Sequence, residues 1–178
     1  MDLLVSYGWS RFGAAEHEIL ETLGRFGDAH AHVARTNVQG LALVHTALDG
    51  REVVRRCREL FHEGFVFAYT AKWMPVDYWC DTDLETMRGV LATKVRDRIA
   101  AKETWGLRVE KHRSYQYHVH DIVAFLAPAI DRKVNLDRPD KLVRVDIIGA
   151  RTAISVLSPG EIFSIAAAAE LAPIEPHA

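Results

Sequence analysis

One stretch of the chain decides its fold class: Trp105–Ile165, WGLRVEKHRSYQYHVHDIVAFLAPAIDRKVNLDRPDKLVRVDIIGARTAISVLSPGEIFSI. It opens with Leu107 and Val109 alternating with Arg108 and Glu110, a pattern typical of a half-buried strand. A helical pattern follows, and then two β-rich runs, LVRVDII and AISVLS, separated by a short turn. A strand, a helix and a strand in this order predict two parallel strands in one sheet.

The first of the two β-rich runs has mixed polarity. Arg144 and Asp146 alternate in it with valine and isoleucine. A central strand of a parallel sheet is usually apolar on both faces, so we expect one face of this strand to be exposed. Arg151 in the following turn either adds to a positively charged edge of the sheet or is an ordinary turn residue.

Positive charge collects before and within the opening strand of this stretch. Between Arg88 and Arg113 the chain has eight Lys or Arg residues and three acids, an excess of five positive charges. Thr82 and Glu85 form a capping pattern, and an apolar stripe after them predicts a helix of about twenty residues. The cations that repeat every four residues along its other side predict a ridge that neutralises RNA phosphates. These are Lys94, Arg98 and Lys102.

Aromatic residues follow the strand directly. Tyr115, Tyr117 and His118 interleave with Lys111 and Arg113. Aromatic rings stack on unpaired bases while cations hold the backbone, so this segment is a candidate for binding single-stranded RNA.

The histidines of the same segment support a second hypothesis, a ferredoxin-like α+β protein that holds a metal or small ligand through His112, His118 and His120. A metal site needs three or four converging ligands. Against it, the His-x-His pattern lies where a helix is about to begin, and Asp121 suits the first turn of that helix. Elemental analysis distinguishes the two hypotheses.

The first half of the chain predicts a separate α+β unit. Its order is strand, helix, two strands joined by a hairpin at 37–40, a helix capped by Asp49, and a strand, which is the βαββαβ order of a ferredoxin-like domain. Ser10 and Gly27 are expected to bound the first helix. Pro75 marks a boundary, so the expected domains are 1–74, 75–165 and a frayed tail, 166–178.

Composition limits the function classes. Apolar residues make up 49% and charged residues 26% of the chain, as in soluble globular proteins, and the net charge of −2 requires any basic surface to be local. The two cysteines predict a reduced, cytoplasmic setting, and the N-terminus has no signal-peptide pattern. No phosphate loop, serine elbow or paired catalytic cysteine is present in the sequence, so we expect neither an enzyme nor a bound cofactor.

Three motifs resemble the THUMP domain, an RNA-binding module of tRNA-modifying systems. They are PVDYWCDTDLETM (75–87), ETWGLRVEKHR (103–113) and KVNLDRPDKLVRVDIIGARTAISVLSPGEIFS (133–164), and the acidic helix start at His120-Asp121-Ile122 adds to the match. The resemblance implies an N-terminal ferredoxin-like domain and an α/β THUMP domain with a mixed sheet. It also implies that the protein grips the single-stranded 3′ end and acceptor region of tRNA. Among stand-alone members, the likeness is to adaptors that present tRNA to a separate cytidine acetylation enzyme.

The resemblance assigns RNA contacts to Lys111, His112 and Arg113. Related stand-alone sequences tend to have lysine, arginine and histidine in that order, so the second and third positions are exchanged here. The full set of expected RNA-binding residues is Lys94, Arg98, Lys102, Arg108, Lys111, His112, Arg113 and Arg151.

Overall fold

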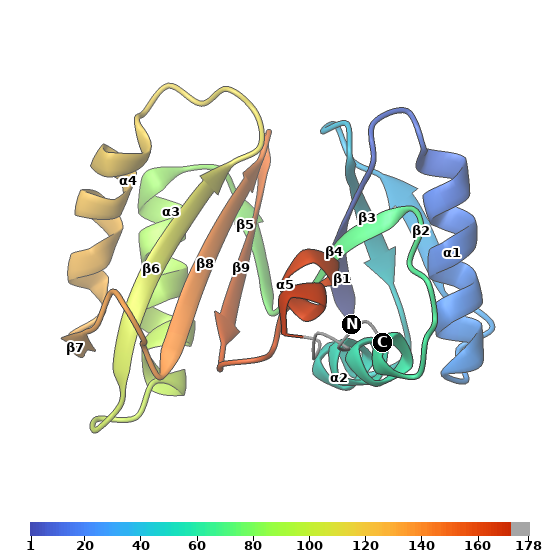
Figure 1. The fold of residues 1–178 in the computed structure, drawn as a ribbon. Helices are drawn as coiled ribbons and strands as arrows, with labels where there is room; N and C mark the ends of the chain where they lie inside the picture. The colour runs from blue at the N-terminus through green and yellow to red at the C-terminus, as the bar shows by residue number, and fades with distance from the viewer. Residues whose placement is uncertain (172–178) are drawn as a thin grey trace. The chain divides into compact units, whose positions relative to one another are not determined.

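The computed structural model describes residues 1–171 and shows two compact units, each built on its own sheet (Figure 1). Unit 1 consists of Met1–Arg35, Gln39–Pro75 and the segment from Gly160 onward. Unit 2 consists of Thr36–Val38 and Val76–Pro159. Within residues 1–171, no helix has both the length and the apolar character needed to cross a membrane.

Unit 1 is a five-stranded sheet with the strand order β10-β4-β1-β3-β2. Its elements are β1 (Asp2–Tyr7), α1 (Phe12–Arg25), β2 (His32–Arg35), β3 (Leu41–His45), α2 (Gly50–His62), β4 (Thr70–Val76), β10 (Phe163–Ser164) and α5 (Ile165–Glu170). β3 pairs antiparallel with both β1 and β2. Leu3 of β1, Ile19 of α1 and Val53 of α2 are fully buried in one core, so both helices cover the same face of the sheet.

The helix ends of unit 1 follow the local sequence signals in part. Asp49 caps α2 as predicted, because its Oδ1 accepts hydrogen bonds from the backbone N–H groups of Arg51 and Glu52, both at 3.0 Å. Gly27 follows α1 with φ of 101°, a conformation that favours glycine. The expected cap at Ser10 is wrong: the N-cap position is Arg11, which makes no capping side-chain bond.

Unit 2 is a mixed five-stranded sheet with the order β5-β9-β8-β6-β7. Its elements are β5 (Tyr78–Asp81), α3 (Leu84–Val90), η1 (Leu91–Val95), η2 (Arg96–Arg98), β6 (Thr104–Lys111), α4 (Val119–Leu126), η3 (Ala127–Ala129), β7 (Lys133–Val134), β8 (Lys141–Ile148) and β9 (Arg151–Leu157). β6 and β8 pair in parallel, which confirms the predicted crossover, and β8 pairs antiparallel with β9. α3 and α4 lie together on one face of the sheet (Figure 1).

The helix expected over about twenty residues is shorter and irregular. After α3 the chain makes a π-helical turn, η1, and a 3-10 turn, η2, and it becomes extended at Ile99. Leu91, Val95 and Ile99 are four residues apart, and in an α-helix each such step over-rotates by about 40°. The π-turn spans the first step, Leu91–Val95, and all three side chains are fully buried in the core of unit 2.

The C-terminal segment that begins at Gly160 belongs to unit 1, whereas the expected boundary at residue 165 assigned its first residues to the second domain. β10 pairs antiparallel with β4, and Phe163 lies opposite Trp73 in the core of unit 1. A guanidinium N–H of Arg58 donates to the carbonyl oxygens of Gly160 and Ile162, at 2.6 and 3.0 Å. These contacts place residues 160–171 in unit 1. The end of the expected tail, residues 172–178, lies outside the described residues.

Candidate nucleic-acid interface

The candidate interface lies at the end of β6, where the chain leaves the sheet of unit 2 for α4. We call residues 111–118 the β6–α4 loop. The ammonium of Lys111 donates to the carbonyl oxygen of Tyr117 at 2.8 Å and so closes this loop. Tyr115 packs against the core of unit 2, and burial raises the pKa of its phenol. Tyr117 is exposed and meets the Tyr115 ring edge to face, with 5.5 Å between centroids.

His112 is held from beneath by a buried charge network. Its Nε2 lies 2.8 Å from Oδ1 of Asp146, and the Arg144 guanidinium donates to both carboxylate oxygens of Asp146, at 2.8 and 3.2 Å. Burial alone would raise the pKa of Asp146, but the hydrogen bonds from His112 and Arg144 outweigh it and lower the pKa below its usual value. The expected exposed face of β8 is therefore wrong: Asp146 is 1% exposed, because its charge is satisfied internally.

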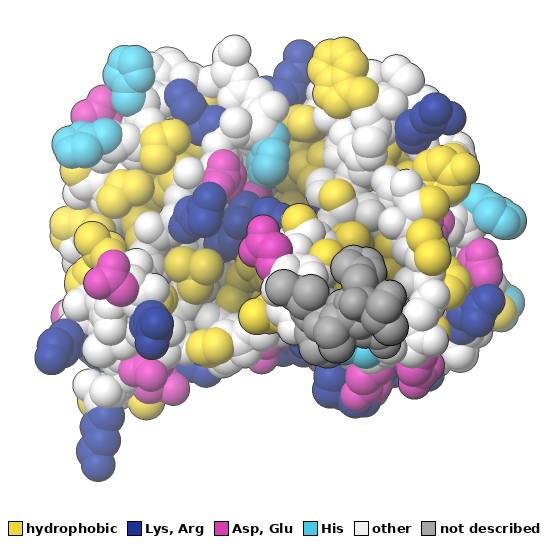
Figure 2. Space-filling view, in the orientation of Figure 1, with side chains coloured by type: hydrophobic (Ala, Val, Ile, Leu, Met, Phe, Trp, Pro, Cys, Tyr) yellow, Lys and Arg dark blue, Asp and Glu magenta, His cyan; other side chains and the backbone are white. Residues whose placement is uncertain are grey.

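Three of the expected RNA-binding arginines are paired with carboxylates of unit 2. Their partners are Asp77 for Arg98 (3.0 Å), Glu110 for Arg108 (2.9 Å) and Asp81 for Arg151 (2.8 Å). An adjacent carboxylate cancels much of the field that would attract a phosphate. On the face drawn in Figure 2, Lys and Arg side chains likewise lie among Asp and Glu side chains and form no single continuous positive area.

His112 is paired with Asp146, and the other four expected cations, Lys94, Lys102, Lys111 and Arg113, have no carboxylate partner among residues 1–171. Lys94 lies over the Tyr78 ring, with its ammonium 5.7 Å from the centroid, and Arg113 donates to the backbone carbonyl of Asn37 at 3.0 Å. Lys102 and Arg113 lie near opposite ends of β6, which at ~3.3 Å per residue separates them by about 25 Å. The structure therefore does not join Lys94, Lys102 and Arg113 into the ridge that the spacing predicted.

The histidines do not converge as the second hypothesis requires. His112 is engaged with Asp146, while the His120 side chain is 94% exposed. His118 is the N-cap residue of α4 and makes no capping side-chain bond. Within residues 1–171, no group of three or more His, Cys, Asp or Glu side chains is placed to hold a metal ion.

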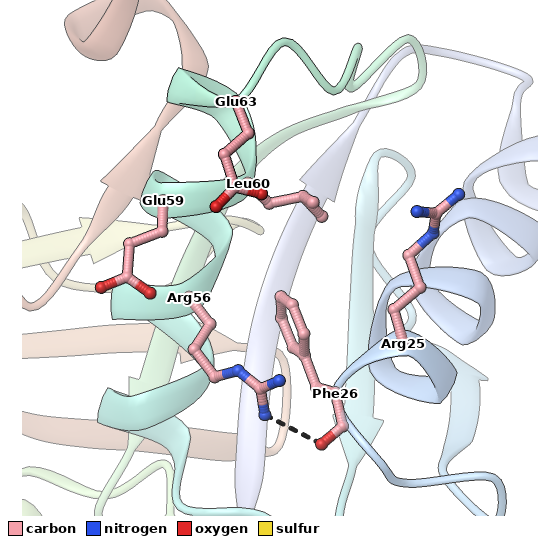
Figure 3. A pocket seen from close by; sticks show the side chains of 6 residues that line it. All are labelled: Arg25, Phe26, Arg56, Glu59, Leu60 and Glu63. Atoms are coloured by element: carbon pink, nitrogen blue, oxygen red, sulfur yellow. Dashed lines mark hydrogen bonds between the residues drawn. The ribbon is translucent and has the colours of Figure 1, made fainter.

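A pocket of about 220 Å³ in unit 1 is lined by arginines that already have partners within unit 1 (Figure 3). Arg56 stacks over the Phe26 ring, 4.4 Å from its centroid, and donates to the Phe26 carbonyl at 2.9 Å. Arg25 pairs with Glu21, outside the pocket, and Glu59 pairs with a neighbouring arginine of α2. The two pocket arginines thus already have partners, and the Glu59 and Glu63 carboxylates add negative charge.

The sequence did not reveal which cations would be neutralised, because the partner acids come from other strands or from two residues along the same strand. Asp77 directly precedes β5, Asp81 is the last residue of β5, and β5 lies beside β9 in the sheet. The one available signal was the spacing of Arg108 and Glu110, which places both side chains on the same face of β6.

Comparison with known proteins relates this architecture to larger proteins, although no family model matches the sequence. The chain is 30% identical over 135 residues to the uncharacterized protein MJ0421 of Methanocaldococcus jannaschii, a match covering 74% of this chain and 34% of MJ0421. The crystal structure of PH1313 from Pyrococcus horikoshii superposes with a TM-score of 0.65 at 14% identity, covering 92% of this chain and 55% of PH1313. A 4-thiouridine synthetase in complex with RNA and ATP superposes with a TM-score of 0.60 at 14% identity, covering 92% and 41%.

These matches define the fold that the chain shares. The chain spans about a third of the length of MJ0421 and about half or less of the two structures. At 14% identity, the two structural matches establish a common architecture of both units and leave activity to be argued from the residues.

Proposed function

We propose that this chain is an RNA-binding protein of the THUMP type. It would hold the single-stranded 3′ end and acceptor region of tRNA and present the tRNA to a separate modification enzyme. Its ferredoxin-like unit would be unit 1 and its THUMP domain unit 2. The three motifs of the sequence support this proposal, and so does the fold shared with a synthetase that was solved together with RNA.

The proposal rests on one observation in the structure: the β6–α4 loop presents a cation and aromatic rings together. Arg113 has no carboxylate partner among the described residues, and Tyr117 and His118 of the same loop are exposed. Rings that stack on unpaired bases next to a cation that binds phosphate are the features of single-strand recognition. Lys111 fixes the shape of the loop through the Tyr117 carbonyl.

The role of the chain would be non-catalytic, and cytidine acetylation is the modification that the sequence likeness favours. Both cysteines are buried and free, as suits a cytoplasmic protein, and burial raises the pKa of each thiol, which disfavours the nucleophilic thiolate.

Filter binding to intact tRNA and to the same tRNA lacking its single-stranded 3′ end tests the proposal. We expect tighter binding to the intact molecule. Tyr117→Ala should reduce that preference, and Tyr117→Phe, which keeps the ring, should retain it. Equal affinity for the two RNAs, or no binding at low salt, would refute the proposed function.

A further inference from the structure

Trp9 is the most exposed tryptophan of the chain. It lies in the loop between β1 and α1 and is 76% exposed, whereas Trp73 and Trp105 are buried in the two cores. An exposed indole is available to stack on the face of an unpaired base. The motifs that support the THUMP resemblance do not include it.

The backbone next to Trp9 is in contact with the turn between β2 and β3. Tyr7 donates its N–H to the carbonyl of Gly40 at 2.9 Å, so the loop after β1 lies beside the β2–β3 turn (Figure 1). Gly40 has φ of 86°, and a Cβ there would lie 4.0 Å from Cδ1 of Trp9. One edge of the indole therefore lies close to the turn at Gly40.

Two arginines near Trp9 carry uncancelled charge. Arg35 stacks on the Phe12 ring with 3.9 Å between the guanidinium carbon and the ring centroid, and stacking leaves its N–H edge free to donate. Neither Arg35 nor Arg11 has a carboxylate partner among residues 1–171. The segments YGWSRFG (7–13) and ARTNVQG (34–40) contain no acid.

A hollow of about 120 Å³ adjoins the loop that carries Trp9, and Ser10, the next residue along the chain, helps to line it. It is lined by Tyr7, Ser10, Phe12, Gly13, Arg35 and Gln39, all in unit 1. Unlike the pocket of Figure 3, its lining contains a cation and no carboxylate. The hollow thus offers a positive recess with hydrogen-bonding groups, and the loop that lines part of it also carries the exposed Trp9.

We infer that Trp9, Arg11 and Arg35 form a second single-stranded RNA site, in unit 1, with a base stacked on Trp9 and an adjacent phosphate held by the arginines. This inference rests on the proposed function and adds a surface to it. The free charge of the arginines favours a polyanion over an apolar protein partner. Stacking on an exposed ring tolerates any base, so the site would bind single strands without sequence preference.

Fluorescence anisotropy with a fluorescein-labelled single-stranded RNA hexanucleotide tests this site in the full chain. Trp9→Ala should weaken binding about 5- to 100-fold, and Trp9→Phe should lose less. Arg35→Gln should reduce the slope of log affinity against log salt by ~0.7 for one lost phosphate. The matched controls are Val66→Ala, an equally exposed apolar side chain of unit 1, and Arg55→Gln, whose charge is already paired with Glu52 and Glu59.

The outcomes separate this inference from the proposed function. If wild-type protein binds tRNA and the hexanucleotide and Trp9→Ala binds both equally well, the second site is wrong and the proposed function stands. If wild-type protein binds neither RNA, both are wrong. A loss in Val66→Ala as large as that in Trp9→Ala would also overturn the site, because the effect would then not be specific to the ring.

Discussion

The buried charges of β8 in unit 2 and the exposed cation of the β6–α4 loop, Arg113, differ in whether they have a charged partner. Arg144 and Asp146 are both buried and satisfy each other, together with His112. Arg113 lies two residues beyond the end of β6 and has no carboxylate partner among residues 1–171. This difference shows that an excess of cations in one stretch of sequence does not by itself produce a positively charged surface, because the fold can pair those cations with carboxylates. Paired charges hold the fold, and unpaired ones are available to a polyanion.

The largest expected effect comes from breaking the buried network. Asp146→Ala leaves Arg144 as an uncompensated buried charge, and we expect a loss of about 3–5 kcal/mol in the free energy of unfolding. Urea denaturation measures it. Asp81→Ala, which removes a mostly exposed partner of Arg151, is the matched control and should cost less than ~1 kcal/mol. Similar losses for the two variants would contradict the distinction between buried and exposed pairs.

A pH titration sharpens the same distinction. The pKa of Asp146 is lower in the folded chain than its usual value of 3.8. Its ionised form therefore contributes stability that is fully present above that value and is lost as the pH falls through the folded pKa. Thermal unfolding of wild-type protein between pH 6 and pH 2 should lose this contribution, and Asp146→Asn should lack it. Parallel pH profiles for the two proteins would show that Asp146 is not held ionised.

Much of the fold follows from the sequence in physical terms. The alternation of Leu107 and Val109 with charged neighbours correctly gave β6, and Asp49 correctly gave the start of α2, because both signals act within a few residues. The length of α3 did not follow, because a four-residue apolar spacing suits either a long helix or a π-turn. The path of the C-terminal segment depends on Phe163 meeting the core of unit 1, a long-range contact with no local signal.

The candidate interface was predictable only in part for the same reason. The aromatic residues of the β6–α4 loop are close in sequence to Lys111 and Arg113, so it was predictable that rings and cations would share one loop. The partners of Arg98 and Arg151 are 21 and 70 residues away along the chain, and only the folded sheet brings them together.

The salt dependence of tRNA binding tests the central claim most directly, by comparing two double variants that remove equal charge. Lys94→Gln with Arg113→Gln removes cations without carboxylate partners, and Arg108→Gln with Arg151→Gln removes cations that have them. We expect the first variant to reduce the slope of log affinity against log salt by up to ~0.9 for each lost phosphate contact, and the second to leave it near the wild-type value. Equal reductions in the two variants, or a larger one in the second, would contradict the account.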